Sequence, residues 1–112
     1  MMEDHFISAG QFVEKYKAGQ LKQEQVIDVR EPYEWEMYHL EDSTLIPMNT
    51  IPENLEQLPK NQPLYIVCGH GVRSWHVTNF LLQQGFDQVI NVEGGMAEVA
   101  LFMQSGEIKG EQ

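Results

Sequence analysis

The feature that most constrains the fold is a series of short, largely apolar runs in which apolar residues do not alternate with polar ones. The clearest lie at residues 26–29, 64–67 and 89–92. Strands of this kind are buried on both faces, as in a parallel sheet covered by helices. Residues 74–84, between the last two runs, have apolar residues at helical spacing. This alternation predicts an α/β fold: a central, mostly parallel sheet of about five strands, flanked by helices on both faces.

Weaker signals add the outer elements. Residues 6–7 and 44–46 fit short strands. Ser8 and Thr50 each precede a helical pattern at the spacing of a capping box, so we predict that both cap helices. Pro32 predicts the start of another helix, because the first turn tolerates the missing N–H of proline.

The length of the chain predicts one domain. A chain of 112 residues supports one ordinary hydrophobic core. We expect a single domain over residues 1–112, with its core at about residues 6–103. The remaining segment, residues 104–112, is polar and is expected to fray.

The composition argues against several classes of partner. Seventeen acidic and seven basic residues give a net charge of −10, which repels nucleic acid and anionic membranes. No apolar run approaches the roughly 20 residues that span a bilayer, and the N-terminus does not resemble a signal peptide. One cysteine and four scattered histidines predict neither a disulfide nor a metal site. We therefore expect a cytoplasmic protein without a metal or cofactor.

The segment at residues 68–74, Cys-Gly-His-Gly-Val-Arg-Ser, carries the strongest chemical signal. It follows the run at 64–67, and sites in parallel sheets form beyond the carboxyl ends of strands. Its two glycines allow the backbone to curl so that N–H groups form an anion site. A helix start and Arg73 add further N–H donors and a positive charge. All of these favour a thiolate, so Cys68 is a candidate nucleophile; the alternative is a buried small hydrophobic residue.

Several motifs together resemble the single-domain rhodaneses, a family of sulfurtransferases. The family's Cys-x-x-Gly-x-Arg-Ser/Thr loop is matched at Cys68, Gly71, Arg73 and Ser74. Upstream, the stretch Asp-Val-Arg-Glu-Pro at residues 28–32 is similar to the family's Asp-Val-Arg-Glu element. The resemblance spans about residues 6–103 and implies the rhodanese-like version of the predicted α/β fold.

The sequence also departs from the family pattern at three places. Tyr38 stands before His39, where the family usually has glycine. Glu41-Asp42 replaces a Pro-Gly turn, and Val99 lies near a position where many members have tryptophan. These departures concern local loop shape and leave the cysteine chemistry unchanged.

The resemblance implies a persulfide mechanism. In the family, the loop cysteine takes a sulfane sulfur from a donor such as thiosulfate or a persulfide, and a thiophilic acceptor then removes it. Carried over by position, Cys68 is the nucleophile, and Arg73 orients the loop and steadies the anion. The partners implied are a small-molecule or protein-bound sulfur donor and a thiol acceptor. The residues that would bind the outer sulfur are Gly69, His70, Gly71 and Val72.

Other residues are expected to support the loop. Ser74 begins the following helix, and Asp28 and Arg30 follow a buried strand. For these last two we favour a structural ion pair over direct catalysis. His70 can contact an acceptor and transfer a proton, or be a spectator. The acidic stretch at residues 31–42 is most simply a solvated face, with a basic partner protein as the alternative.

Three other functions compete with sulfur transfer. Cysteine-based phosphatases have five residues between cysteine and arginine, whereas four lie between Cys68 and Arg73, and the shorter loop favours sulfur. A binding or regulatory module is a second alternative, against which the retained cysteine and arginine count. A thiol redox sensor is a third, but a single cysteine would need an external thiol to resolve its sulfenic acid. We predict a rhodanese-type sulfurtransferase.

Overall fold

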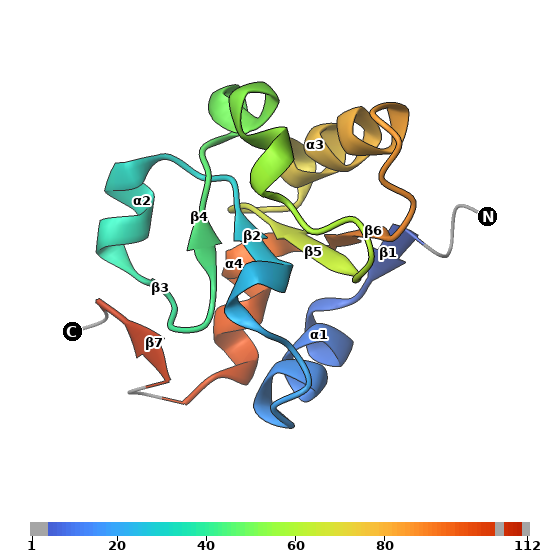
Figure 1. The fold of residues 1–112 in the computed structure, drawn as a ribbon. Coiled ribbons are helices and arrows are strands. Elements are labelled where there is room, and N and C mark those ends of the chain that lie inside the picture. The colour runs from blue at the N-terminus through green and yellow to red at the C-terminus, as the bar shows by residue number, and fades with distance from the viewer. Residues whose placement is uncertain (1–4, 105–106, 111–112) are drawn as a thin grey trace.

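A parallel sheet of five strands runs through the centre of the computed structural model, which describes residues 5–104 and 107–110 (Figure 1). The strand order is β1-β6-β5-β2-β4. The central strand β5 is buried at every residue, as is its neighbour β2, which explains why their sequences do not alternate. The predicted α/β architecture is confirmed. The strands are β1 (Phe6–Ile7), β2 (Val26–Asp28), β4 (Thr44–Leu45), β5 (Leu64–Val67) and β6 (Val89–Val92).

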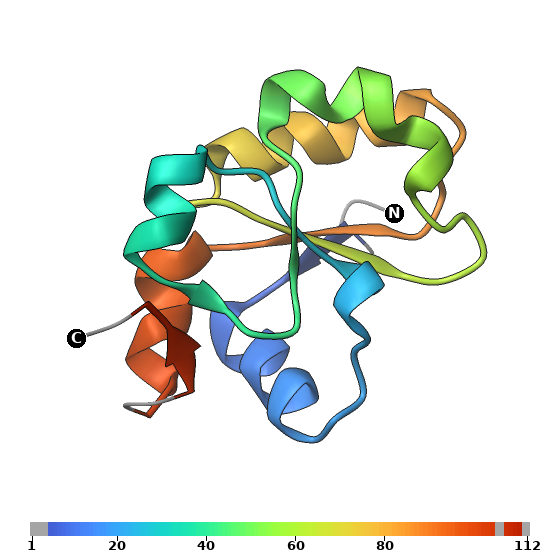
Figure 2. The same ribbon diagram turned by 60° about the vertical axis from the view of Figure 1, so that its left-hand side comes forward.

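Helical segments cover both faces of the sheet (Figure 2). The helix α3 (Val72–Gln83) and the 3-10 segment η3 (Met48–Gln57) cover one face. The helices α1 (Ala9–Lys17) and α4 (Gly95–Val99) cover the other. The remaining elements are η2 (Gln23–Gln25), α2 (Pro32–Met37), β3 (His39–Leu40), η4 (Ala100–Phe102) and β7 (Ile108–Lys109).

The two faces form two separate hydrophobic clusters, and the chain through β5 contributes to them in turn. Tyr65 and Val67 belong to the cluster under α1 and α4. Ile66 and Cys68 belong to the cluster under α3 and η3. Successive side chains of a strand point to opposite faces. The sulfur of Cys68 is therefore directed toward the side of α3, the helix that follows it in the chain.

The predicted helix starts are confirmed at two places and wrong at one. Ser8 caps α1, since its Oγ accepts the N–H of Gln11 at 3.1 Å, and Pro32 is the first residue of α2. Thr50 is not a cap. Its Oγ1 donates to the carbonyl of Pro47 at 2.8 Å, because η3 starts at Met48 as a tight 3-10 turn.

Two boundaries also differ from the prediction. The helix α3 begins at Val72 rather than Ser74, after Gly71 in the left-handed region with φ +99°. The expectation that residues 104–112 fray is wrong for Ile108–Lys109. This strand pairs antiparallel with β3, and Ile108 is only 4% exposed. Residues 105–106 and 111–112 of this tail lie outside the described residues.

Candidate functional site

The sulfur of Cys68 lies at the focus of the loop that joins β5 to α3. Its Sγ accepts the N–H of Gly71 at 3.1 Å and the N–H of Ser74 at 3.2 Å. The backbone N–H of His70 also hydrogen-bonds the sulfur, and the Oγ of Ser74 lies 3.2 Å away. The curled backbone expected from the two glycines is present, with its amides aimed at the sulfur.

Burial and hydrogen bonding act on this thiol in opposite directions. The residue is fully buried, and burial by itself raises the pKa of the Cys68 thiol. The backbone N–H groups of Ser74, Gly71 and His70 act in the opposite direction, and the pKa of Cys68 lies below its ordinary value. Cys68 packs in the core, as expected from the alternative prediction of a buried small hydrophobic residue. Its sulfur nevertheless has the polar contacts of a reactive thiol. Because no surface of Cys68 is exposed, a reactant reaches it only when the loop atoms that cover it move.

The start of α4 holds the loop from its other side. Met96 N–H donates to the carbonyl of Cys68 at 2.7 Å, and Ala97 N–H donates to the carbonyl of Gly69 at 3.0 Å. These carbonyls therefore face α4 and not the sulfur. The approach requires glycine at position 95, where a Cβ atom would lie 2.4 Å from the Cys68 carbonyl oxygen.

The guanidinium of Arg73 makes a two-point ion pair with Glu34 of α2. Its Nη1 lies 2.7 Å from Oε1 and its Nη2 lies 2.9 Å from Oε2. The hydrogen bond from Arg73 lowers the pKa of Glu34 from 4.5 to about 2, and the pKa of Arg73 is raised in turn. The sequence interpretation of residues 31–42 as a solvated face is wrong for Glu34, whose side chain is 19% exposed. The positive charge of Arg73, which was expected to stabilise an anion, is therefore largely neutralised by the Glu34 carboxylate.

Glu34 reaches Arg73 because of where their two helices leave the sheet. Helix α2 leaves the carboxyl end of β2, and α3 leaves the carboxyl end of β5 after a short loop. Because β2 and β5 are neighbours in the sheet, the first turns of these helices meet. An acidic side chain on α2 therefore reaches a basic side chain on α3.

Asp28 and Arg30 form the ion pair that was favoured from the sequence. The Nε and Nη2 of Arg30 donate to the two carboxylate oxygens of Asp28 at 2.8–3.1 Å, and both side chains are buried. Nη2 also donates to the carbonyl of Tyr38 at 2.8 Å. The pair thus ties the end of β2 to the chain that leads into β3, beside the loop rather than in it.

Behind the sulfur, Ser74 contacts Asn91 of β6. The Oγ of Ser74 lies 2.5 Å from the Oδ1 of Asn91, and the Nδ2 of Asn91 donates to the carbonyl of Gly71 at 3.4 Å. Both residues are buried. Asn91 was not predicted from the sequence, although a single amide inside the buried run at 89–92 is a signal, because buried polar groups need partners.

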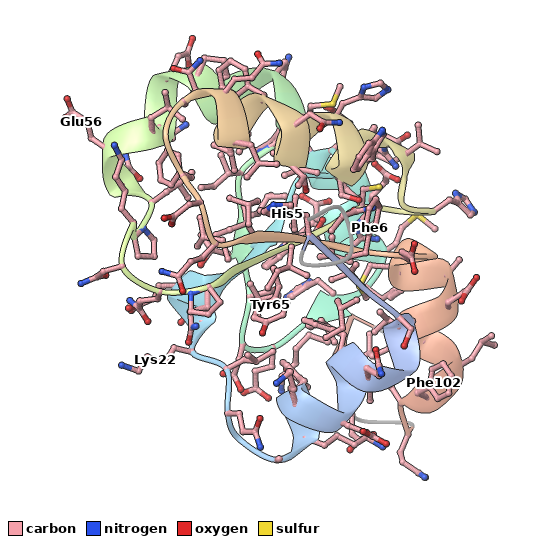
Figure 3. All side chains as sticks on the ribbon, turned by 90° about the vertical axis from the view of Figure 1, so that its right-hand side faces the viewer. His5, Phe6, Lys22, Glu56, Tyr65 and Phe102 are labelled. Atoms are coloured by element: carbon pink, nitrogen blue, oxygen red, sulfur yellow. The ribbon has the colours of Figure 1, made fainter. Side chains whose placement is uncertain are left out.

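Two hollows open on either side of the loop, and His70 lines both. One, of about 340 Å³, lies beside Phe6, Val72 and Trp75. Phe6, labelled in Figure 3, stacks on Trp75 with ring centroids 4.9 Å apart. The other, of about 170 Å³, is lined by residues that include Gly69, Arg30 and Glu34. The loop residues expected to bind the outer sulfur therefore border these hollows.

Neither a metal-binding cluster nor a membrane-spanning helix occurs in the part of the chain that the structure describes. Within residues 5–104 and 107–110, no three His, Cys, Asp or Glu side chains gather closely enough to hold a metal ion. In the same residues, no helix is long and apolar enough to cross a bilayer.

Known proteins share both the sequence pattern and the fold. A sulfurtransferase of Allochromatium vinosum is 34% identical over 71 residues, 63% of this chain and 66% of that protein. The thiosulfate sulfurtransferase GlpE of Vibrio cholerae is 30% identical over 74 residues, 66% of this chain and 70% of that protein. The match thus spans about two thirds of each of these two relatives. The crystal structure of a rhodanese-like domain protein from Staphylococcus aureus superposes with a TM-score of 0.77 and 39% identity, covering 85% of this chain and 90% of that one.

The family model described as a rhodanese-like domain matches residues 8–101, which includes the whole loop around Cys68. The match thus covers most of the chain and agrees with the fold and with the relatives. The chain therefore belongs to the rhodanese-like domain family, and two of the relatives it resembles are named sulfurtransferases.

Proposed function

We propose that this protein is a sulfurtransferase that carries sulfane sulfur on Cys68, from a donor such as thiosulfate or a persulfide to a thiophilic acceptor. The observation that carries the proposal is the convergence of three backbone N–H groups on the sulfur of the chain's single cysteine. Fixed N–H dipoles stabilise a negative sulfur without the need to reorganise during the reaction.

The reaction has two displacement steps. In the first, the Cys68 thiolate attacks the outer sulfur of the donor, and the donor's S–S bond breaks with both electrons leaving on the remaining fragment, sulfite in the case of thiosulfate. In the second, a thiolate acceptor attacks the outer sulfur of the Cys68 persulfide. The S–S bond of the persulfide then breaks, and its electrons return to Cys68 as thiolate. Sulfur changes carriers, and no outside oxidant or reductant is consumed.

The loop residues have separate roles in this scheme. The N–H groups of His70 and Gly71 stabilise the thiolate and then the persulfide. The side chain of His70 borders both hollows and is placed to meet an acceptor. Arg73 positions the loop through Glu34 more than it attracts an anion, because its charge is paired.

The paired charge bears on the choice of donor. With Arg73 matched by Glu34, the loop offers dipoles rather than a free positive charge. A dianion such as thiosulfate gains less from such a loop than from an unpaired arginine, and the net charge of −10 opposes its approach. A persulfide of low charge, free or on another protein, is therefore the favoured donor.

Mass spectrometry of the intact protein tests this function. After incubation with cysteine persulfide or thiosulfate and removal of the donor, the wild-type protein should gain the mass of one sulfur atom, and Cys68→Ala should not. Dithiothreitol or cyanide should then remove the added sulfur. If neither donor loads the wild-type protein, or if Cys68→Ala gains the same mass, the proposed function is wrong.

A further inference from the structure

Asn91 reaches Cys68 only through Ser74, and its position decides where the Ser74 proton lies. A hydroxyl group has one proton, whereas the Oδ1 of an amide has none. The short Oγ–Oδ1 contact of 2.5 Å therefore needs the Ser74 proton between its two oxygens. The lone pairs of Ser74 Oγ are then left to face the Cys68 sulfur at 3.2 Å.

The orientation of the Asn91 amide is set by a second contact. Its Nδ2 donates to the carbonyl of Gly71. The reverse orientation would place Oδ1 against that carbonyl, two acceptors with no proton to share. Ser74 and Asn91 are both buried, with Asn91 at the edge of the hollow beside Trp75, so replacement partners for either group are few.

This arrangement suits a thiol better than a thiolate. The S–H of a neutral Cys68 can donate to Ser74 Oγ, and the Ser74 hydroxyl in turn donates to Asn91 Oδ1. A thiolate has no proton to give and would face an oxygen lone pair. For Ser74 to donate to a thiolate, its hydroxyl must rotate away and leave the buried Oδ1 of Asn91 without a donor, which is costly.

We propose that Asn91 is a positioning residue that holds the Ser74 proton away from Cys68 and so keeps the resting thiol more protonated than the loop amides alone would. For the proposed sulfur transfer, this has a consequence: in a Cys68 persulfide the negative charge lies on the outer sulfur, beyond the reach of Ser74. Asn91 thus disfavours the free thiolate, whereas the charge of the persulfide lies too far from Ser74 to be affected in the same way.

The charged groups around Cys68 belong to several elements and stay the same in the variants used below. Arg73 of α3 is paired with Glu34 of α2, and Arg30 is paired with Asp28 after β2. His70 lies in the loop itself. On the remaining sides, acidic side chains follow β6 at Glu93 and occur on α4 at Glu98.

The test measures Cys68 ionisation and not sulfur transfer, so it separates this inference from the proposed function. The rate of alkylation by iodoacetamide against pH gives the apparent pKa of Cys68. Asn91→Leu should lower that pKa by about one unit, a tenfold faster alkylation at a pH below both values, because Ser74 is then free to donate to the thiolate. Asn91→Asp should raise it. In a Ser74→Ala background, Asn91→Leu should have no further effect.

A measurement on the wild-type protein covers the case in which a variant does not fold. The side-chain 13Cγ and 15Nδ2 signals of Asn91 should titrate with the same apparent pKa as Cys68, and these titrations should vanish in Ser74→Ala or Cys68→Ala. The inference is overturned if Asn91→Leu raises the pKa or leaves it unchanged, or if it shifts the pKa equally without Ser74. It is also overturned if the Asn91 signals do not respond to Cys68 ionisation.

Discussion

Replacing Glu34 with glutamine should destabilise the fold by about 1–2 kcal/mol at pH 7. The pKa of Glu34 falls from 4.5 to about 2 in the folded state, chiefly through the hydrogen bonds from Arg73. That difference corresponds to roughly 3 kcal/mol of stabilisation. We reduce the figure because the side chains of Arg73 and Glu34 are 34% and 19% exposed, and solvent screens such pairs. Glutamine keeps the size of the side chain but removes its charge.

The dependence on pH gives this prediction its signature. Because the pKa of Glu34 is lower in the folded state, the stabilisation is complete above pH 4.5 and is lost as the pH falls toward 2. Glu34→Gln has no such stabilisation to lose. The difference in stability between wild type and variant should therefore be largest near neutral pH and should close between these two values.

Urea denaturation followed by circular dichroism at several pH values measures the difference directly. Glu36→Gln is the matched control, since Glu36 is exposed on the same helix. It should change the free energy of unfolding by less than about 0.5 kcal/mol. The reasoning is refuted if Glu34→Gln is as stable as the wild type at pH 7, or if the difference between them persists unchanged near pH 2.

Three further predictions concern Gly95, Arg73 and Ile108, with Gly85 as a control for Gly95. Gly95→Ala should lower the free energy of unfolding by several kcal/mol or prevent folding, because its Cβ would overlap the Cys68 carbonyl. Gly85 also has a positive φ but lies in open space, so Gly85→Ala should lower the free energy of unfolding by only about 1 kcal/mol, as measured by thermal unfolding. Arg73→Lys should slow persulfide formation about tenfold in a stopped assay, since an ammonium group cannot satisfy both oxygens of a carboxylate. Ile108→Ala should destabilise by about 2 kcal/mol in urea, because this side chain is buried; no effect would mean that β7 is dispensable.

The fold was predictable because its strongest signals are local. The run at residues 64–67 is apolar at consecutive positions since β5 lies in the centre of the sheet, and the position of Cys68 follows from where that run ends. Ser8 and Pro32 predicted helix starts because capping chemistry involves only a few neighbouring residues. Each of these signals depends on residues close together in the chain.

The features that were missed depend on residues far apart in the chain. Glu34 and Arg73 meet because β2 and β5 are neighbours, and strand order is not written in the hydrophobic pattern. Asn91 reaches Ser74 across the sheet-helix interface for the same kind of reason. Ile108 belongs to a strand of two residues, which is too short to show any period. Local sequence patterns therefore locate the loop, but they do not identify the distant side chains that pair with Arg73 or contact Ser74.

A negatively charged sulfur is compatible with a net charge of −10, because the loop amides and the surface acids act on it over different distances. The amides lie 3.1–3.2 Å from the sulfur and act at contact. Exposed acidic groups are screened beyond about 8 Å at physiological salt. Ionisation of Cys68 is thus governed by the loop, Ser74 and Asn91, while the surface charge governs what approaches. Changes in the loop should therefore move the pKa of Cys68 at any ionic strength, whereas changes in surface acids should alter the rate of encounter with a charged donor, and mainly at low salt.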